Sequence, residues 1–173
     1  MQRRDHAPHE ILLPARPAFI VFTLAAALIV NLLPWSGWLL AIKPDFVALV
    51  VLYWCIHQPR KVGFASAWLM GLMMDVADGS LFGQHAFSYS VLAYAGIVLH
   101  RRVLGFTMRD QILHVIPLLL LSDIIVIIIR RVAGAEFPGF SYFAGSLIAG
   151  ALWPVLSFLL KLPQIPRRDP DHV

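Results

Sequence analysis

The strongest constraint on the fold of this chain is a series of long apolar runs, separated by short segments that are basic, polar or rich in proline. Hydrophobic residues make up 59% of the sequence and charged residues only 14%. Soluble domains carry about a quarter charged residues, so this balance is typical of proteins embedded in lipid. The sequence therefore predicts an all-α integral membrane protein built as a single compact bundle.

Six membrane-spanning helices are predicted. The second is short, because a bilayer core is usually crossed by about 20 residues, and Pro44 and Pro59 bound it on both sides. Interfacial aromatic residues at its ends, local thinning of the bilayer or burial inside the bundle are the explanations considered. We expect an N-terminal tail (1–17), a transmembrane domain (18–161) and a C-terminal tail (162–173), with spans at 18–40, 46–57, 62–79, 85–99, 111–129 and 140–160.

The basic residues divide unevenly between the two ends of these spans. With six spans, one side of the membrane holds 11 of the 14 Lys and Arg residues and the other side holds 3. Cytoplasmic loops carry the excess of Lys and Arg, so we expect both termini in the cytoplasm. The minority side holds Lys43, Arg130 and Arg131, and the majority side holds Arg3, Arg4, Arg16, Arg60, Lys61, Arg101, Arg102, Arg109, Lys161, Arg167 and Arg168.

The third span carries small residues at every fourth position, interrupted by one aspartate. We call this set the small-residue seam: Gly63, Ala67, Gly71, Asp75 and Gly79. Residues at this spacing share one helix face, and small side chains let another helix approach closely inside a bilayer. A carboxylate there should face the bundle, since a charge in lipid is costly. We therefore expect this helix inside the bundle, with Asp75 either joining two helices by a hydrogen bond or acting directly in function.

Further polar residues are expected near the depth of Asp75. Under the predicted topology Asn31 and Asp123 also fall in the outer half of the bilayer, with Gln84, His85 and Arg130 just above them. Buried carboxylates in lipid are usually paired, neutralised or turned towards a cavity. The sequence thus predicts a polar cluster at the outer end of the bundle, which could be a site or only a link between helices.

Several functions were weighed against these residues. An aspartyl peptidase needs two carboxylates that share a proton, and neither Asp75 nor Asp123 lies in a glycine-flanked motif of that kind. A proton or ion relay, a small-molecule binder and a membrane scaffold are the other readings. The single Cys55 excludes an intrachain disulfide and a cysteine-based metal cluster. We expect no catalytic residue, cofactor or metal, and no nucleic-acid partner, because phosphate loops and basic-aromatic stripes are missing.

Four stretches resemble the rod shape-determining MreD family, and together the resemblance covers about 18–161. They are the run PDFVALVVLYW at 44–54 followed by Pro59, the pattern GxxxDxxxGSxxG from Gly71 to Gly83, the segment DIIV at 123–126, and LWP at 152–154. The dibasic pair Arg130 and Arg131 departs from the family pattern.

The resemblance implies a non-enzymatic scaffold subunit of the bacterial cell-elongation complex, located in the inner membrane among its lipids. Such a subunit acts with the single-pass protein MreC. Their assembly links MreB filaments to a SEDS glycosyltransferase and its transpeptidase, and so to peptidoglycan synthesis and rod shape. The residues given a structural or partner-interface role are Pro44, Asp45, Gly71, Asp75, Gly79, Gly83, Asp123, Gly150, Trp153 and Pro154. Among them Pro44 and Asp45 are expected to start and cap the second span.

The six-helix fold of this family is also similar to the substrate-binding subunits of energy-coupling-factor transporters. That similarity supplies the alternative function, a membrane subunit that binds a vitamin for transport. Many such subunits carry an Ala-x-x-x-Ala ridge in the first span. Here the residues at 25–27 are alanines, but those four positions further on are Ile29, Val30 and Asn31. The missing ridge disfavours the transporter reading.

Overall fold

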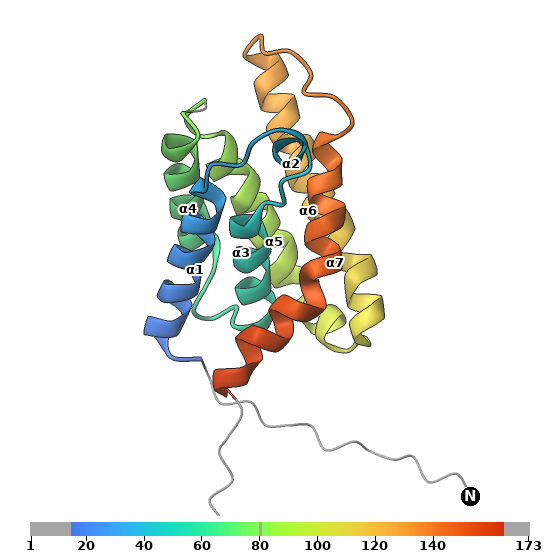
Figure 1. The fold of residues 1–173 in the computed structure, drawn as a ribbon. Coiled ribbons are helices and arrows are strands. Elements are labelled where there is room, and N and C mark those ends of the chain that lie inside the picture. The colour runs from blue at the N-terminus through green and yellow to red at the C-terminus, as the bar shows by residue number, and fades with distance from the viewer. Residues whose placement is uncertain (1–14, 80, 165–173) are drawn as a thin grey trace, which may run out of the picture.

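The computed structural model describes residues 15–79 and 81–164, and all regular structure in these two ranges is helical. The all-α prediction is therefore confirmed for the described residues. Most of the two predicted tails, 1–14 and 165–173, lies outside them. The elements are α1 (Pro17–Leu32), α2 (Trp38–Ala41), α3 (Phe46–His57), α4 (Phe64–Ala77), α5 (Gln84–Leu104), α6 (Met108–Val132), α7 (Tyr142–Lys161) and a 3₁₀ turn (Leu162–Gln164) (Figure 1).

Six of these helices correspond to the six predicted apolar runs, with differences at the ends. The bounds of α3 match the prediction. The first span was predicted to reach residue 40, but α1 ends at Leu32, just before Pro34, which cannot continue the hydrogen-bond ladder. The fourth was predicted to end at residue 99, but α5 continues to Leu104. Arg101 and Arg102 therefore lie in its last turn, where cations interact favourably with the helix dipole.

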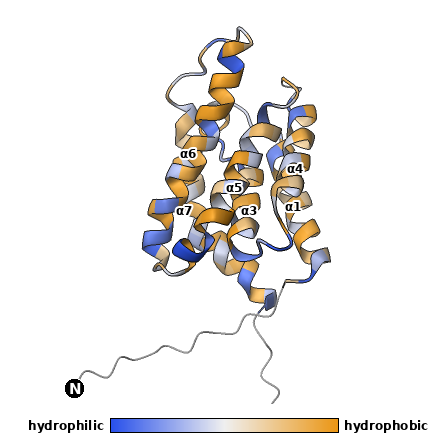
Figure 2. Ribbon diagram, turned by 180° about the vertical axis from the view of Figure 1, so that it is seen from behind, coloured by the Kyte–Doolittle hydropathy of each residue, from blue (hydrophilic) through white to orange (hydrophobic). Residues whose placement is uncertain are grey.

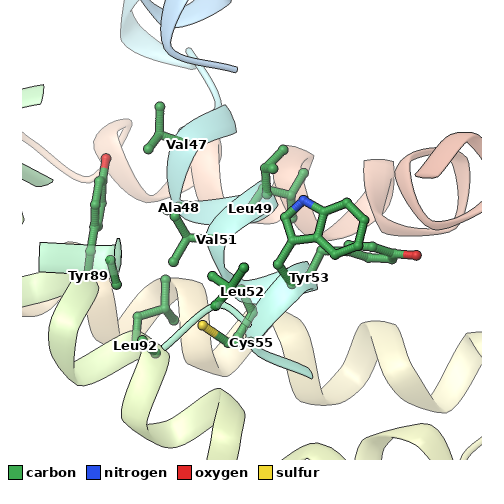
Figure 3. Close-up of a cluster of buried hydrophobic side chains, with 14 of the residues drawn as sticks. Val47, Ala48, Leu49, Val51, Leu52, Tyr53, Cys55, Tyr89 and Leu92 are labelled. Carbon is green, nitrogen blue, oxygen red and sulfur yellow. The ribbon is translucent and has the colours of Figure 1, made fainter. Parts of the chain in front are cut away.

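The centre of the bundle is α3. Ten of its twelve residues are buried, and its side chains point outwards on several sides, with Tyr89 and Leu92 of α5 beside them (Figure 3). Trp54 is fully buried, and its indole donates a hydrogen bond of 2.9 Å to the Thr23 hydroxyl of α1. Burial inside the bundle, one of the explanations considered above, accounts for the short length of this helix.

The prediction that the third span lies inside the bundle is wrong for half of that helix. One face of α4 is buried, and it includes Ala67, Gly71 and Asp75 of the small-residue seam. The opposite face is exposed and holds the large side chains Phe64, Trp68, Leu69, Met73 and Val76. The small side chains bring α4 against α5 on one side only, whereas α3 packs on every side.

Two members of the seam do not lie at a close helix contact. Gly63 is the N-cap of α4, and a Cβ added there would meet only Ile97 Cδ1, at 3.8 Å. Gly79 lies past the end of the helix with a φ of 58°, and an added Cβ would meet nothing within 4 Å. Gly79 therefore serves the turn, where glycine adopts a positive φ without strain, and it does not continue the helix face of the seam.

Glycines also allow close approach elsewhere in the bundle. A Cβ added at Gly145 would collide with the Lys43 carbonyl oxygen, and one at Gly150 would collide with the Ile116 side chain. Gly96 lets α5 approach α3, because a Cβ there would lie 2.9 Å from Leu52 Cδ1. Close approach at Gly150 agrees with its predicted structural role, whereas Gly96 was not singled out from the sequence.

The outer surface of the bundle is largely apolar. Hydrophobic residues cover the helices along their length, and hydrophilic residues gather mostly near the two ends of the bundle (Figure 2). Within the described residues, α6 and the segment Tyr142–Gln164 are long and apolar enough to cross a membrane, by length and composition. The shorter apolar helices are α1, α3 and α4.

The two ends of the bundle differ in the loops they carry. The start of α1 and the end of α7 lie at one end, which we call the terminal end (Figure 1). The Lys61 ammonium, in the α3–α4 turn, donates a 2.6 Å hydrogen bond to the Ala15 carbonyl there. The opposite end carries α2, the α4–α5 turn and the α6–α7 loop, and we call it the cavity end (Figure 1).

Candidate functional site

Asp75 caps the N-terminus of α5 from the neighbouring helix. The N-cap of α5 is Gly83, which has no side chain to accept hydrogen bonds from the first turn. Asp75 supplies the acceptor: its carboxylate receives the backbone N–H groups of Gly83 (2.8 Å), His85 (2.9 Å) and Ala86 (3.4 Å). The His85 ring also contacts it, with Nδ1 2.9 Å from Oδ1.

The Asp75 carboxylate is part of the packing between α4 and α5. The side chain is 1% exposed, and its oxygens hold the α4–α5 turn closed. A carboxylate at a helix N-terminus is further stabilised by the helix dipole. Asp75 therefore joins two helices, as the first of the two readings expected, although its partners are mainly backbone groups of the next turn.

A second carboxylate, Asp45, joins three helices. As predicted, it caps α3 by accepting from the Ala48 N–H at 3.0 Å. It also accepts from the Asn31 amide of α1 at 3.0 Å and from the Tyr89 hydroxyl of α5 at 2.6 Å. Pro44 is buried beside it, next to Gly145 of α7. The predicted role of Pro44 and Asp45 in starting this helix agrees with their positions.

Asn31 completes the cap from the other side. Its side-chain oxygen accepts from the Phe46 N–H at 3.1 Å, and its own carbonyl accepts from the Lys43 ammonium at 2.7 Å. Asn31 is 2% exposed, whereas its partners Lys43, Asp45 and Phe46 are partly buried. The end of α1 is thereby fixed to the start of α3.

Asp123, the other carboxylate predicted to lie within the membrane, is on α6. It is half-buried and accepts a hydrogen bond from the Ser146 hydroxyl of α7. On the preceding residue, the Ser122 carbonyl accepts from the Ser88 hydroxyl of α5 at 2.8 Å. The two bonds fix α6 to both of its neighbours at the same depth.

A cavity of about 660 Å³ opens at the cavity end, and we call it the polar cavity. Of the predicted polar cluster, Asn31, Gln84, His85, Asp123 and Arg130 line this one cavity, so the structure brings them together. Asp75 lies behind it, bonded to His85. The remaining lining residues are Leu40, Lys43, Pro44, Asp45, Met74, Asp78, Gly79, Leu81, Ala133, Ala135, Tyr142, Gly145 and Ser146.

The other predicted interface residues lie away from the polar cavity or inside the bundle. Trp153 is fully buried, and its indole donates to the Gln111 side chain at 3.1 Å. Gly150 lies against Ile116, and the half-buried Pro154 lies inside α7. Gly71 is covered by α5. Trp153 and Gly71 therefore contribute to the internal packing of the bundle.

Some residues of the cavity end were missed by sequence reasoning. Tyr89 was not recognised as the partner of Asp45, and Ser146 was not recognised as the partner of Asp123. Tyr89 had a signal, since a tyrosine inside an apolar run needs a partner for its hydroxyl. Among the described residues, no group of three or more His, Cys, Asp or Glu side chains is placed to hold a metal ion.

Comparison with known proteins identifies the family. A family model described as rod shape-determining protein MreD matches residues 16–162. The rod shape-determining protein MreD of Haemophilus influenzae is 26% identical over 135 residues, which cover 78% of this chain and 83% of that protein. No solved structure matches the chain. The family model spans nearly all of the described bundle, so this chain belongs to the rod shape-determining MreD family of membrane proteins.

Proposed function

We propose that this protein is a non-enzymatic scaffold subunit of the bacterial cell-elongation complex, which binds MreC in the inner membrane and helps couple MreB filaments to peptidoglycan synthesis. The observation that carries the proposal is the family match over residues 16–162. The MreD family is part of the MreBCD rod-shape system, which makes MreC the expected partner.

The packing of the bundle supports a scaffold role. The carboxylates at the cavity end fix helices to one another: Asp45 joins three helices, Asp75 joins two, and Asp123 joins α6 to α7. Five of the helices also present large apolar side chains on the outside of the bundle, among them Phe22, Trp68, Tyr94, Ile128 and Phe158. A rigid body with an apolar surface suits recognition of a single membrane-spanning helix, since helices associate in lipid through such packing.

The proposal includes six membrane spans with both termini in the cytoplasm. It is supported by the 11-to-3 division of basic residues and by the position of the first and last described residues at the same end of the bundle (Figure 1). The cavity end then faces the periplasm, and the terminal end faces the cytoplasm.

Cysteine labelling tests this topology. Phe82 and Glu136 lie at the cavity end, Gly105 lies in the α5–α6 turn, and all three are exposed. In cells with a permeabilised outer membrane, an impermeant thiol reagent should modify cysteines at positions 82 and 136 but not at 105. The wild-type chain is the control, because its single Cys55 is fully buried. Modification of the cysteine at position 105 alone would show that the orientation is opposite to the proposed one.

Co-purification tests the partner. After gentle detergent extraction of the tagged protein, mass spectrometry should find an MreC-like single-pass protein at an amount comparable with the bait. The variant Gly71→Leu cannot keep the α4–α5 contact, and it should no longer co-purify with the MreC-like protein. A matched control is Val132→Ala, because Val132 is 85% exposed at the end of α6 and packs little. Recovery of the bait without such a protein, under conditions that keep the bundle folded, would contradict the partner.

The transporter alternative gains no support from the comparisons. The family model and the Haemophilus influenzae relative both carry the rod-shape description.

A further inference from the structure

The polar cavity has features that the scaffold role does not use. We propose that it binds a cationic group, an alkylammonium or a guanidinium, between Asp123 of α6 and Gln84 of α5. The group belongs either to a small soluble amine or to a Lys or Arg side chain of another protein.

The first feature is the incomplete pairing of Asp123. Its carboxylate is half-buried in the cavity wall and accepts one hydrogen bond, from the Ser146 hydroxyl. Within the described residues, no Lys, Arg or His side chain forms an ion pair with it. Carboxylates at membrane depth are normally paired or turned towards a water-filled cavity, and Asp123 lines a cavity without a charged partner among the described residues. A bound cation would supply that partner.

The second feature is an unused polar group on Gln84. This residue is 2% exposed and lines the cavity, and its side-chain oxygen has no hydrogen-bond partner among the described residues. Its amide nitrogen lies 3.3 Å from His85 Nδ1, so His85 does not serve as a donor to the oxygen at the other end of the amide. A buried acceptor without a donor is destabilising. An N–H donor of a ligand would satisfy this oxygen.

The two groups belong to one wall of the cavity. Ser88, one helical turn beyond Gln84, donates to the Ser122 carbonyl at 2.8 Å, and Ser122 directly precedes Asp123. This hydrogen bond holds the first turns of α5 against the middle of α6. Gln84 and Asp123 also line the same cavity, and the proposed ligand lies between them.

The cations of the cavity do not occupy this position. The Lys43 ammonium donates to the Asn31 carbonyl at 2.7 Å. Arg130 lies seven residues beyond Asp123 on α6, which is about 10 Å along the helix axis, so its backbone stands nearer the mouth. The lining also includes the carboxylates of Asp45 and of the exposed Asp78.

The size of the cavity suits such a ligand. Small-molecule sites occupy about 300–1,000 Å³, and this cavity has about 660 Å³. It is large enough for a short amine or for the end of a basic side chain together with its methylene stem.

The test measures binding of agmatine, which carries a guanidinium and an ammonium and no carboxylate, to the full-length protein in lipid nanodiscs by titration calorimetry. Agmatine should bind the wild type, and succinate, its acidic counterpart, should not. Asp123→Asn, which keeps the shape of the side chain, should weaken agmatine binding at least about tenfold, and Gln84→Ala should weaken it by several fold. The control is Glu136→Gln, which removes the same charge from an exposed residue of the same end that does not line the cavity.

No measurable agmatine binding by the folded wild type would overturn the proposal, as would equal weakening by Asp123→Asn and Glu136→Gln. If the Asp123→Asn variant does not fold, the Gln84→Ala variant decides the test. An unchanged affinity of Gln84→Ala for agmatine then overturns the proposal. A second titration with the MreC-bound protein separates the two sources. Lost binding there identifies a side chain of the partner as the occupant, whereas retained binding identifies a free amine. The titration of the isolated protein does not depend on MreC, so this proposal and the scaffold proposal fail separately.

Discussion

Gly71→Ala is expected to destabilise the protein by about 3 kcal/mol or more, although it adds a single methyl group. A Cβ at this position would lie 2.5 Å from the Ala86 backbone nitrogen and 2.6 Å from the His85 carbonyl carbon. Overpacking usually costs about 1–3 kcal/mol when side chains can move aside, and here the obstacle is backbone. The new methyl group must therefore push α4 away from α5, and this displacement also stretches the hydrogen bonds that Asp75 makes to the first turn of α5.

The matched control is Gly63→Ala on the same helix, where the added Cβ would meet only Ile97 Cδ1, at 3.8 Å. Thermal unfolding of both variants in mild detergent, monitored by circular dichroism, should show a clear loss of stability for Gly71→Ala and little change in stability for Gly63→Ala. Equal stability of the two variants would show that the α4–α5 contact is not as close as described.

Asp75→Leu is expected to be the most damaging substitution of a polar residue in the bundle. It removes the acceptor of the backbone N–H groups of Gly83 and His85 and leaves these donors buried. Removal of one partner of a buried charged interaction costs about 3–5 kcal/mol. We expect a loss of this size, measured by unfolding in detergent and by the amount of folded protein in the membrane.

Asp75→Asn should fall between the wild type and Asp75→Leu. The asparagine keeps one acceptor oxygen but turns an NH₂ group towards donors that were bonded to the other oxygen. The control is Asp78→Asn, three residues further on and exposed, which should change stability by less than about 0.5 kcal/mol. If Asp75→Asn and Asp75→Leu are equally unstable, the charge of Asp75 matters more than its hydrogen bonds.

The ends of a helix could be predicted from the sequence where strong local signals mark them. Pro44 and Pro59 enclose the run that forms α3, and Asp45 is a good cap, so both ends of this helix were predicted correctly. The end of α5 was not, because Arg101 and Arg102 were taken as loop residues. A basic pair suits the last turn of a helix as well as a loop, and the sequence alone does not separate the two.

The central position of α3 was harder to predict than its bounds. The small-residue seam indicated a close helix contact, and this contact exists at Gly71. A close contact on one face does not place a helix in the centre, however. The exposed Trp68 and Met73 on the other side of α4 are apolar, and in a membrane protein apolar side chains face lipid as readily as the core.

The polar cluster was predicted as a group, but its pairs were not. The positions of Asn31, Asp123 and His85 along the six predicted spans placed them at one end of the bundle, and the structure agrees. The partners of the carboxylates were not visible in the same way. Asp75 bonds to backbone groups, which any sequence provides, and Tyr89 reaches Asp45 across 44 positions of the chain.

The most direct test of the scaffold function is the shape of cells depleted of this protein. Depletion in the rod-shaped bacterium that carries it should make the cells round up and widen, as followed by phase-contrast microscopy, with no requirement for a vitamin. A plasmid copy of the wild type or of Gly63→Ala should restore rods, whereas Gly71→Leu should not. Depleted cells that remain rod-shaped, or whose growth defect is relieved by a vitamin supplement, would contradict the account.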